Sequence, residues 1–394
     1  MRKICVITGT RAEFGLLSGL MRLIQQSEQT TLQVVATNMH LSERYGNTYR
    51  EIEEAGFSID NKVPMLDESG ADDSTATLKA MSRALVGFAE AYDALHPDLI
   101  VVLGDRYEIL AAVETALIKQ IPVAHLHGGE LTFGAYDDAI RHSITKMSHL
   151  HFTSTEEYRK RVIQLGEQPE RVFYVGALGV ENIKQVPLMS KSEIEQDLQF
   201  ELTDQTILVT YHPVTLSDSN PLDDINALFE ALDEHPELRV IFTMPNSDTG
   251  GKVIAEAIEQ YATQHINRVR AYKSLGMRRY LSVMKYCTAV VGNSSSGILE
   301  APSFHIPTLN IGSRQDGRIA ATSVYNCSTD KESISAALEH ILTPEFRAIA
   351  SKARNPYAKE GTAQAIFEVI STYLLENIIQ KKFYDLEENA NRFT

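Results

Sequence analysis

The segment PDLIVVLGDRYEILAAVETALIKQIPVAHLHG, residues 97–128, contains two apolar runs on either side of an amphipathic stretch. Residues 99–105 and 122–128 have the length and the β-branched character of buried strands, and residues 107–119 have the length of a helix. Two such strands joined by one helix are typical of neighbouring parallel strands with a helical crossover. The segment therefore predicts a parallel α/β sheet.

The same alternation of strand and helix continues on both sides of this segment. In the first half it predicts strands at 3–9, 31–38, 150–155 and 171–177 and helices at 16–27, 78–95 and 156–165. After residue 176 a polar stretch interrupts the pattern, which then restarts with strands at 206–212, 239–246, 268–274, 289–297 and 306–312. We therefore predict an α/β fold of two doubly wound domains, residues 1–178 and 184–360, with parallel sheets on either side of a cleft.

The composition limits the classes of partner. The 394 residues carry a net charge of −15, and a diffuse negative charge repels nucleic acids and anionic membrane surfaces. The three cysteines, Cys5, Cys287 and Cys327, are too few and too scattered for a disulfide framework. No stretch approaches the roughly 18 apolar residues of a membrane span, and the apolar run near the N-terminus is too short for a signal peptide. We expect a cytoplasmic protein with neither a nucleic-acid nor a membrane partner.

Polar clusters follow several of the predicted strands, at the sheet edges where ligands of such folds bind. Each cluster also has a plainer structural interpretation. Arg11 in GTRAE binds phosphate or is a solvated charge, and Asp105 in GDR faces a ligand or caps a helix. His212 in YHP is catalytic or structural. The sequence GNSSSGILE, which ends at Glu300, starts a phosphate-binding helix with Glu300 on a ribose, or it starts an ordinary capped helix.

The stretch HLHGGELTFGAYDDAIRH, which begins at His125, suits either a metal site or acid-base chemistry without a metal. His125 and His127 share one face of a strand, but no third ligand with suitable spacing is adjacent. In the other interpretation, Glu130 and Asp137 lie near Asp105, and burial with mutual repulsion raises the pKa of a carboxylate towards neutrality. Such a carboxylate cluster suits proton abstraction, and we predict it in preference to a metal site.

Eight motifs together resemble the hydrolysing UDP-N-acetylglucosamine 2-epimerases of bacterial sialic acid biosynthesis. They are GTRAEFG, MHLSERYGNTYREIE, VVLGDRYEI, HLHGGE, DDAIRHSITKMSHLHFTSTEEYRKRVIQLGE, YHPVTLS, GNSSSGILEAPSF and IGSRQDGR. The resemblance extends from residue 2 to roughly residue 385. The long motif from Asp137 to Glu167 is specific, well beyond a chance match.

This resemblance implies a fold like that of the GT-B glycosyltransferases, with two Rossmann-like domains and a last helix, at about residues 362–380, that packs back on the first domain. It implies that UDP-N-acetylglucosamine and water give N-acetylmannosamine and UDP. The steps would be proton abstraction at C2, anti elimination of UDP to 2-acetamidoglucal, and hydration. It also implies that no metal and no other cofactor is needed, that the partners are the UDP-sugar and UDP, and that the chain forms a homo-oligomer, a dimer or a tetramer.

The resemblance also implies roles at the positions that match the family motifs. Catalytic roles fall to Asp105, Glu130, Asp137 and His212. Relatives that do not hydrolyse carry a catalytic glutamate where this chain has His127, so the roles in the HGGE loop depart from that pattern. The implied UDP-sugar contacts are Arg11, Arg106, His127, Asn246, Ser294, Ser295, Ser296, Gly297, Glu300 and Arg314.

Several other functions fit the same sequence. A hydrolysing 2-epimerase of a UDP-linked 2,4-diacetamido-2,4,6-trideoxyhexose, on the route to legionaminic acid, carries the same motifs. A GT-B glycosyltransferase would use the same nucleotide pocket but needs an acceptor. A metal-dependent hydrolase would lose activity to a chelator, and a nucleotide-sugar sensor would bind UDP without turnover.

Overall fold

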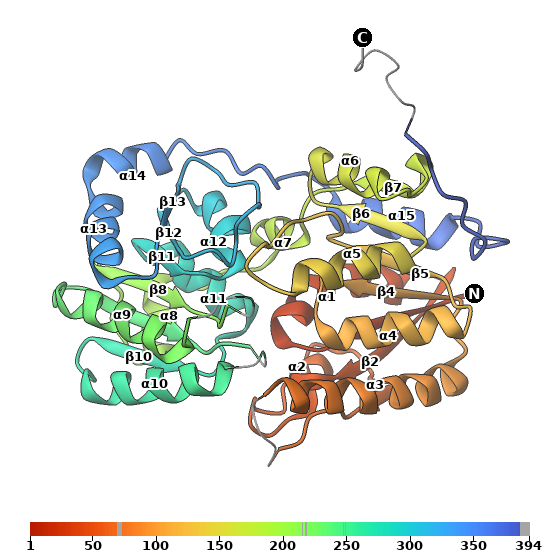
Figure 1. Cartoon of the computed structure of the whole chain (residues 1–394), viewed down its shortest axis with the longest axis horizontal. Coiled ribbons are helices and arrows are strands. Elements are labelled where there is room, and N and C mark those ends of the chain that lie inside the picture. The colour runs from red at the N-terminus through yellow and green to blue at the C-terminus, as the bar shows by residue number, and fades with distance from the viewer. Residues whose placement is uncertain (69–72, 215, 217–218, 247, 249, 387–394) are drawn as a thin grey trace, which may run out of the picture.

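The computed structural model describes residues 1–68, 73–214, 216, 219–246, 248 and 250–386 (Figure 1). Within these residues the chain forms two sheets of parallel strands, one with seven strands and one with six, and helices cover both sheets. The predicted α/β class with two parallel sheets is confirmed. No helix in the described ranges is both long and apolar enough to cross a membrane.

The seven-stranded sheet and the helices packed on it are called the first lobe. Its strands, in spatial order, are β3 (Asn61–Val63), β2 (Thr30–Thr37), β1 (Arg2–Thr8), β4 (Leu99–Leu103), β5 (Val123–Leu126), β6 (Leu150–Thr153) and β7 (Val172–Tyr174). Its helices are α1 (Arg11–Gln26), α2 (Tyr49–Glu54), α3 (Ser74–Leu95), α4 (Tyr107–Ile118), α5 (Asp137–Met147), α6 (Glu156–Gln164) and α7 (Leu178–Gln185).

The six-stranded sheet and its helices are called the second lobe. Its strands, in spatial order, are β10 (Val269–Tyr272), β9 (Arg239–Thr243), β8 (Thr206–Thr210), β11 (Ala289–Gly292), β12 (Thr308–Ile311) and β13 (Val324–Cys327). Its helices are α8 (Lys191–Leu198), α9 (Pro221–Asp233), α10 (Gly251–Gln264), α11 (Gly276–Tyr286), α12 (Ser295–Leu299), α13 (Lys331–Leu342) and α14 (Pro344–Ala350). Short 3-10 turns occupy Asn38–Leu41, Pro169–Arg171 and Ala301–Phe304.

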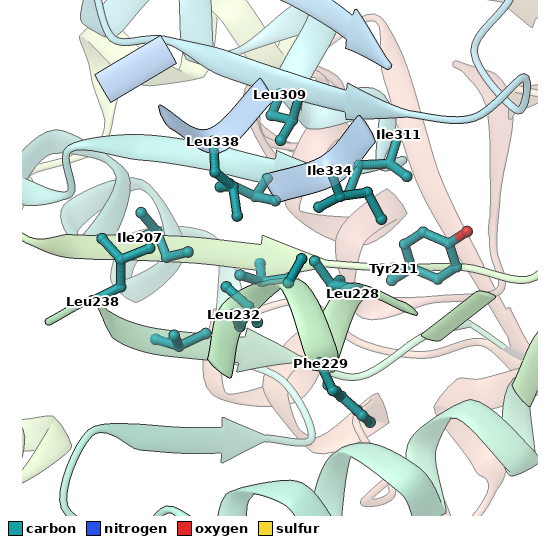
Figure 2. Close-up of a cluster of buried hydrophobic side chains, with 14 of the residues drawn as sticks. Ile207, Tyr211, Leu228, Phe229, Leu232, Leu238, Leu309, Ile311, Ile334 and Leu338 are labelled. Carbon is teal, nitrogen blue, oxygen red and sulfur yellow. The ribbon is translucent and has the colours of Figure 1, made fainter. Parts of the chain in front are cut away.

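Both faces of each sheet are buried, which explains why the strands are apolar along their whole length. In the second lobe, one face of the sheet packs against α9, α10 and α13, and Figure 2 shows part of this core. Ile207 on β8, Leu228 on α9 and Leu338 on α13 are all completely buried there. Burial of a side chain of this size stabilises the fold by roughly 1.5–3 kcal/mol, so the sheet face is a rigid base for the loops at its edge.

Some elements differ from the sequence prediction. Helix α1 begins at Arg11 rather than at residue 16, because the side chain of Thr10 accepts a hydrogen bond from the backbone N–H of Glu13 and caps the helix there. Helix α5 was not predicted, since its polar sequence resembles a loop. The short edge strands β3 and β13 were also missed.

A last helix, α15 (Thr362–Thr372), packs against α1 of the first lobe. Its apolar residues Ala363, Ile366 and Ile370 belong to the core of that lobe. The helix is shorter than the predicted span of about 362–380, because the backbone leaves helical geometry at Tyr373.

Candidate functional site

A cavity of about 570 Å³ opens between the two lobes. Its walls are the segments that follow β1, β4, β8, β9, β10 and β11, all at the carboxyl ends of their strands. The strand order reverses between β1 and β4 in one sheet and between β8 and β11 in the other. Ligands of doubly wound folds bind at such switch points, and the volume suits a small molecule.

The cavity brings together most of the residues predicted from the sequence. The first lobe contributes Arg11, Asp105, Arg106 and Asp137, and the second lobe contributes His212, Asn246, Ser294, Ser295, Ser296, Glu300 and Arg314. Three other predicted residues, His127, Glu130 and Gly297, lie outside its lining.

Asp105 presents a charged oxygen to the cavity wall. Its side chain is 21% exposed, and its carboxylate forms an ion pair with Arg141 of α5, which is itself buried. Arg141 also donates to the carbonyl oxygen of Glu130 at 2.9 Å and to Oγ1 of Thr132 at 3.1 Å. The alternative role of Asp105 as a helix cap does not occur, since the N-cap of α4 is Arg106. Asp105 therefore lines the cavity while its ion pair with Arg141 holds the carboxylate in place.

Asp137 is the first residue of α5 and is almost completely buried beside the cavity. Burial raises the pKa of its carboxyl to about 7, and the charge of Asp248 from the second lobe acts in the same direction. Arg314 and Arg106 oppose this rise. A carboxyl with a pKa near neutrality can both accept and deliver a proton, as the sequence analysis expected of the carboxylate cluster.

Glu130 differs from the expectation that it performs acid-base work in the cavity. It is buried, and its oxygens are occupied by Nδ1 of His127 at 2.9 Å, Oγ of Ser154 at 2.8 Å and Nη1 of Arg318 at 2.9 Å. Burial alone would raise its pKa, but Arg318 and the other partners lower it to about 2. The structure thus places Glu130 in a buried ion-pair network outside the cavity lining, and its assignment to acid-base work stays a prediction.

His125 on β5 and His127 at the start of the HGGE loop both contact protein groups. His125 contacts Oγ1 of Thr145 at 3.1 Å and the carbonyl oxygen of Gly104 at 2.7 Å, and burial lowers its pKa to about 3. His127 adopts a left-handed backbone with φ of +67°, a conformation that costs energy for residues other than glycine. In the described part of the chain, no group of three or more metal-ligating side chains could hold a metal ion.

Glu13 is a cavity residue that the sequence analysis missed. It lies in the first turn of α1, is buried, and accepts a hydrogen bond from the backbone N–H of Gly9 at 2.5 Å. Burial, and then the charge of Glu108, raise its pKa to about 8. The pattern Thr10-x-x-Glu13, which is that of a helix capping box, is the signal that locates this residue at the start of a helix.

Three of the four arginines that line the cavity were predicted as ligand contacts, and each of these three has partners within the protein. Arg11 forms an ion pair with Glu51 of α2. Arg106 contacts Glu108 and Asp248, and Nη1 of Arg314 donates to the carbonyl oxygen of Asn293 at 3.1 Å. Arg11, Arg106 and Arg314 thus lie at one cavity of a chain whose net charge is negative, and arginine side chains suit the binding of an anion there.

The second lobe fixes the ring of His212. Its backbone N–H donates to Oδ1 of Asn293 at 2.7 Å, and its ring Nδ1 accepts from the backbone N–H of Asn246 at 3.3 Å. Burial, and then Arg314, lower the pKa of His212 well below its ordinary value. The ring is therefore neutral, with its proton on Nε2, which makes it a hydrogen-bond donor.

The serine-rich turn after β11 lies next to this histidine. Gly292 has φ of +125°, and a Cβ there would lie 2.0 Å from the carbonyl oxygen of Thr210, so only glycine allows this approach to β8. Ser294 caps the short helix α12, and Oγ of Ser296 bonds to the hydroxyl of Tyr280. Glu300 ends the helix, and burial raises its pKa to about 7.

Comparison with known proteins supports this picture of a two-lobed α/β enzyme with a nucleotide-sized cleft. Residues 22–371 match the family model described as UDP-N-acetylglucosamine 2-epimerase. A Campylobacter jejuni protein named GDP/UDP-N,N'-diacetylbacillosamine 2-epimerase (hydrolyzing) is 41% identical over 386 residues, which is 98% of this chain and 99% of the relative. The polysialic acid biosynthesis protein P7 of Escherichia coli is 37% identical and covers 98% of each chain.

A solved structure shows the same fold. The UDP-GlcNAc 2-epimerase from Neisseria meningitidis bound to UDP-GlcNAc has a TM-score of 0.78 at 17% identity, over 93% of this chain and 99% of that chain. This chain therefore belongs to the UDP-N-acetylglucosamine 2-epimerase family, and within it to the hydrolysing branch. The family that the sequence motifs predicted is confirmed.

Proposed function

We propose that this protein converts UDP-N-acetylglucosamine and water to N-acetylmannosamine and UDP, for the synthesis of a sialic acid. The observation that carries the proposal is a single cavity with two carboxylates on one side, Asp105 and Asp137, and the His212 and Glu300 loops on the other. Family membership supplies the reaction class. In this proposal the first lobe transfers protons to and from the sugar, and the second lobe binds the nucleotide.

The proposed reaction proceeds by elimination and hydration. Asp105, an anion held by Arg141, accepts the proton from C2 while the bond between C1 and the UDP oxygen breaks, which leaves 2-acetamidoglucal. Asp137, with a pKa of about 7, delivers a proton to C2 from the opposite face, and water adds at C1. The neutral ring of His212 donates a hydrogen bond to the departing diphosphate, and Arg314 compensates its charge.

The reaction can be tested in deuterated water. The released sugar is expected to carry one deuterium at C2, because the proton that returns to C2 comes from a group that exchanges with solvent. Mass spectrometry and NMR of the product check this. Unlabelled product would contradict proton abstraction, and sugar release that requires an added acceptor would favour a glycosyltransferase instead.

A second substrate has a specific observation in its favour. Two relatives, from Campylobacter jejuni and Legionella pneumophila, are named hydrolysing 2-epimerases of diacetylbacillosamine nucleotides, and they are 41% and 36% identical to this chain. The alternative substrate is therefore a UDP-linked 2,4-diacetamido-2,4,6-trideoxyhexose. Comparison of kcat/KM for the two nucleotide sugars, with the same enzyme preparation, distinguishes them.

Glu300 is proposed to bind the ribose of the nucleotide. Its side chain lines the cavity and lies so close to Gly179 of the first lobe that a Cβ there would be 2.2 Å from Oε1. We expect Glu300→Ala to weaken UDP binding more than tenfold, about 1.4 kcal/mol, as measured by calorimetry. Glu345→Ala, which removes an exposed first-turn acid of α14, is the matched control. Equal UDP affinities for the two variants would show that Glu300 does not bind the ribose.

A further inference from the structure

Hydroxyl groups from four elements of the second lobe meet at the cavity. The hydroxyl of Tyr280 on α11 hydrogen-bonds to Oγ of Ser296 on α12. The last residues of two neighbouring strands, Thr210 of β8 and Thr243 of β9, hydrogen-bond to each other through their Oγ1 atoms at 2.5 Å. All four residues line the cavity. Of the four, the sequence analysis predicted a role only for Ser296.

Tyr280 joins these two pairs into one chain of hydroxyl groups. Burial raises the pKa of its phenol to about 12, although hydrogen bonds with Ser296 and Thr210 oppose the rise. The phenol therefore keeps its proton at neutral pH, and it can donate one hydrogen bond while it accepts another. The chain runs from Thr243 through Thr210 and Tyr280 to Ser296, beside the carboxyl ends of β8 and β9.

The acidity of its members gives this chain a direction. A phenol is a stronger acid than an aliphatic alcohol, so Tyr280 is the better donor and Ser296 is the acceptor. The other hydroxyl near Ser296 is that of Ser294, whose Oγ lies 3.4 Å away, which is long for a hydrogen bond between hydroxyls. Ser296 therefore keeps its own hydrogen for a third group. Successive hydrogen bonds in one direction polarise one another and strengthen the last donor.

We propose that Tyr280 is a positioning residue, which donates to Oγ of Ser296 and so directs the hydrogen of the Ser296 hydroxyl at an oxygen of the nucleotide diphosphate. The nucleotide as the ligand rests on the proposed function, whereas the chain of hydroxyls does not. Arg314 supplies positive charge to the departing diphosphate, and the directed hydroxyl adds a donor at a fixed place. A donor that is oriented in advance stabilises negative charge as it develops.

Calorimetry with UDP tests this proposal. Tyr280→Phe keeps the ring and removes only the hydroxyl, so we expect UDP to bind roughly tenfold more weakly, the effect of one hydrogen bond to a charged group. Tyr286→Phe is the matched control on the same helix. The hydroxyl of Tyr286 donates to the carbonyl oxygen of Met189 at 3.3 Å, outside the cavity lining, and UDP affinity is expected to stay unchanged. Thermal unfolding of both variants checks that they are folded.

A double-mutant cycle separates positioning from packing. Ser296→Ala removes the hydroxyl that Tyr280 is proposed to direct, so in that background Tyr280→Phe is expected to cause no further loss of UDP affinity. A ring that acted through packing alone would weaken binding by the same factor in both backgrounds, and such additive effects would overturn the proposal. Thr210→Val, which breaks the chain one step earlier, is expected to weaken UDP binding by a smaller factor than Tyr280→Phe.

These measurements also distinguish the role of Tyr280 from the proposed function. A wild-type protein that binds UDP but turns over neither nucleotide sugar would remove the proposed function, yet a loss of UDP affinity in Tyr280→Phe would still support the positioning role. An active enzyme whose Tyr280→Phe variant binds UDP as tightly as wild type would refute the positioning role alone. A wild-type protein that does not bind UDP would refute both.

Discussion

Asp105→Asn is expected to lower turnover by at least roughly a hundredfold, the lower end of the effect of an acid-base group. Asparagine has nearly the same shape but cannot take the C2 proton, so the elimination step loses its base. UDP affinity is expected to stay within a few fold of wild type, because the nucleotide is proposed to contact the second lobe. Steady-state kinetics and calorimetry with UDP measure the two quantities separately.

The control for this variant is an aspartate at the opposite end of the same strand, β4. Asp98 stands at the other end of β4, is exposed, and accepts a hydrogen bond from the backbone N–H of Lys3 at 2.8 Å. Asp98→Asn removes the same charge far from the cavity and is expected to leave turnover unchanged. Full activity in Asp105→Asn would exclude Asp105 from proton transfer, and the base would then have to be another carboxylate of the cavity wall.

Glu130→Ala is expected to destabilise the fold by about 3–5 kcal/mol, the usual effect of removing one partner of a buried ion pair. The variant leaves Arg318, whose side chain is 9% exposed, without the carboxylate that neutralises it. Urea unfolding at neutral pH gives the change in the free energy of unfolding. Glu157→Ala, an exposed first-turn acid on α6, is the control and is expected to change stability little.

The contribution of Glu130 also depends on pH. Its pKa in the fold is about 2, below the ordinary 4.5 of a glutamate, so its ionised form is favoured by folding. The stabilisation is therefore complete above pH 4.5 and is lost as the pH falls towards 2. A Glu130→Ala protein with wild-type stability but no turnover would contradict the structural role. Glu130 would then be assigned to acid-base catalysis.

The sequence predicted the sheets well because buried parallel strands leave a strong local signal. Runs such as residues 99–105 are apolar on both faces and are separated by helices of ordinary length. Helix α5 gave no such signal, because it begins with two polar residues: Asp137 lines the cavity, and Asp138 binds the backbone N–H of Thr132. The edge strand β13 is half exposed, so its sequence lacks the apolar run of a central strand.

The sequence predicted those site residues that lie at or near the ends of predicted strands. Asp105, Asp137 and His212 follow or face strand ends, and the structure places all three on one cavity. Glu130 carries a carboxylate, as Asp137 does, and lies in the same segment of the sequence. What separates the two is a partner nearly two hundred residues away, Arg318, and the sequence alone does not show this pairing. Their roles in the reaction stay proposals.

The return of the chain to the first lobe through α15 has a consequence for motion. The chain passes between the lobes twice, after α7 and again before α15, and Nζ of Lys184 near the end of α7 pairs with Oε1 of Glu360 just before α15 at 2.9 Å. Two chain crossings that lie close together restrict how the lobes can move relative to each other, so we expect any opening of the cleft to pivot about them. Such a pivot would bring the same cavity side chains together at every closure.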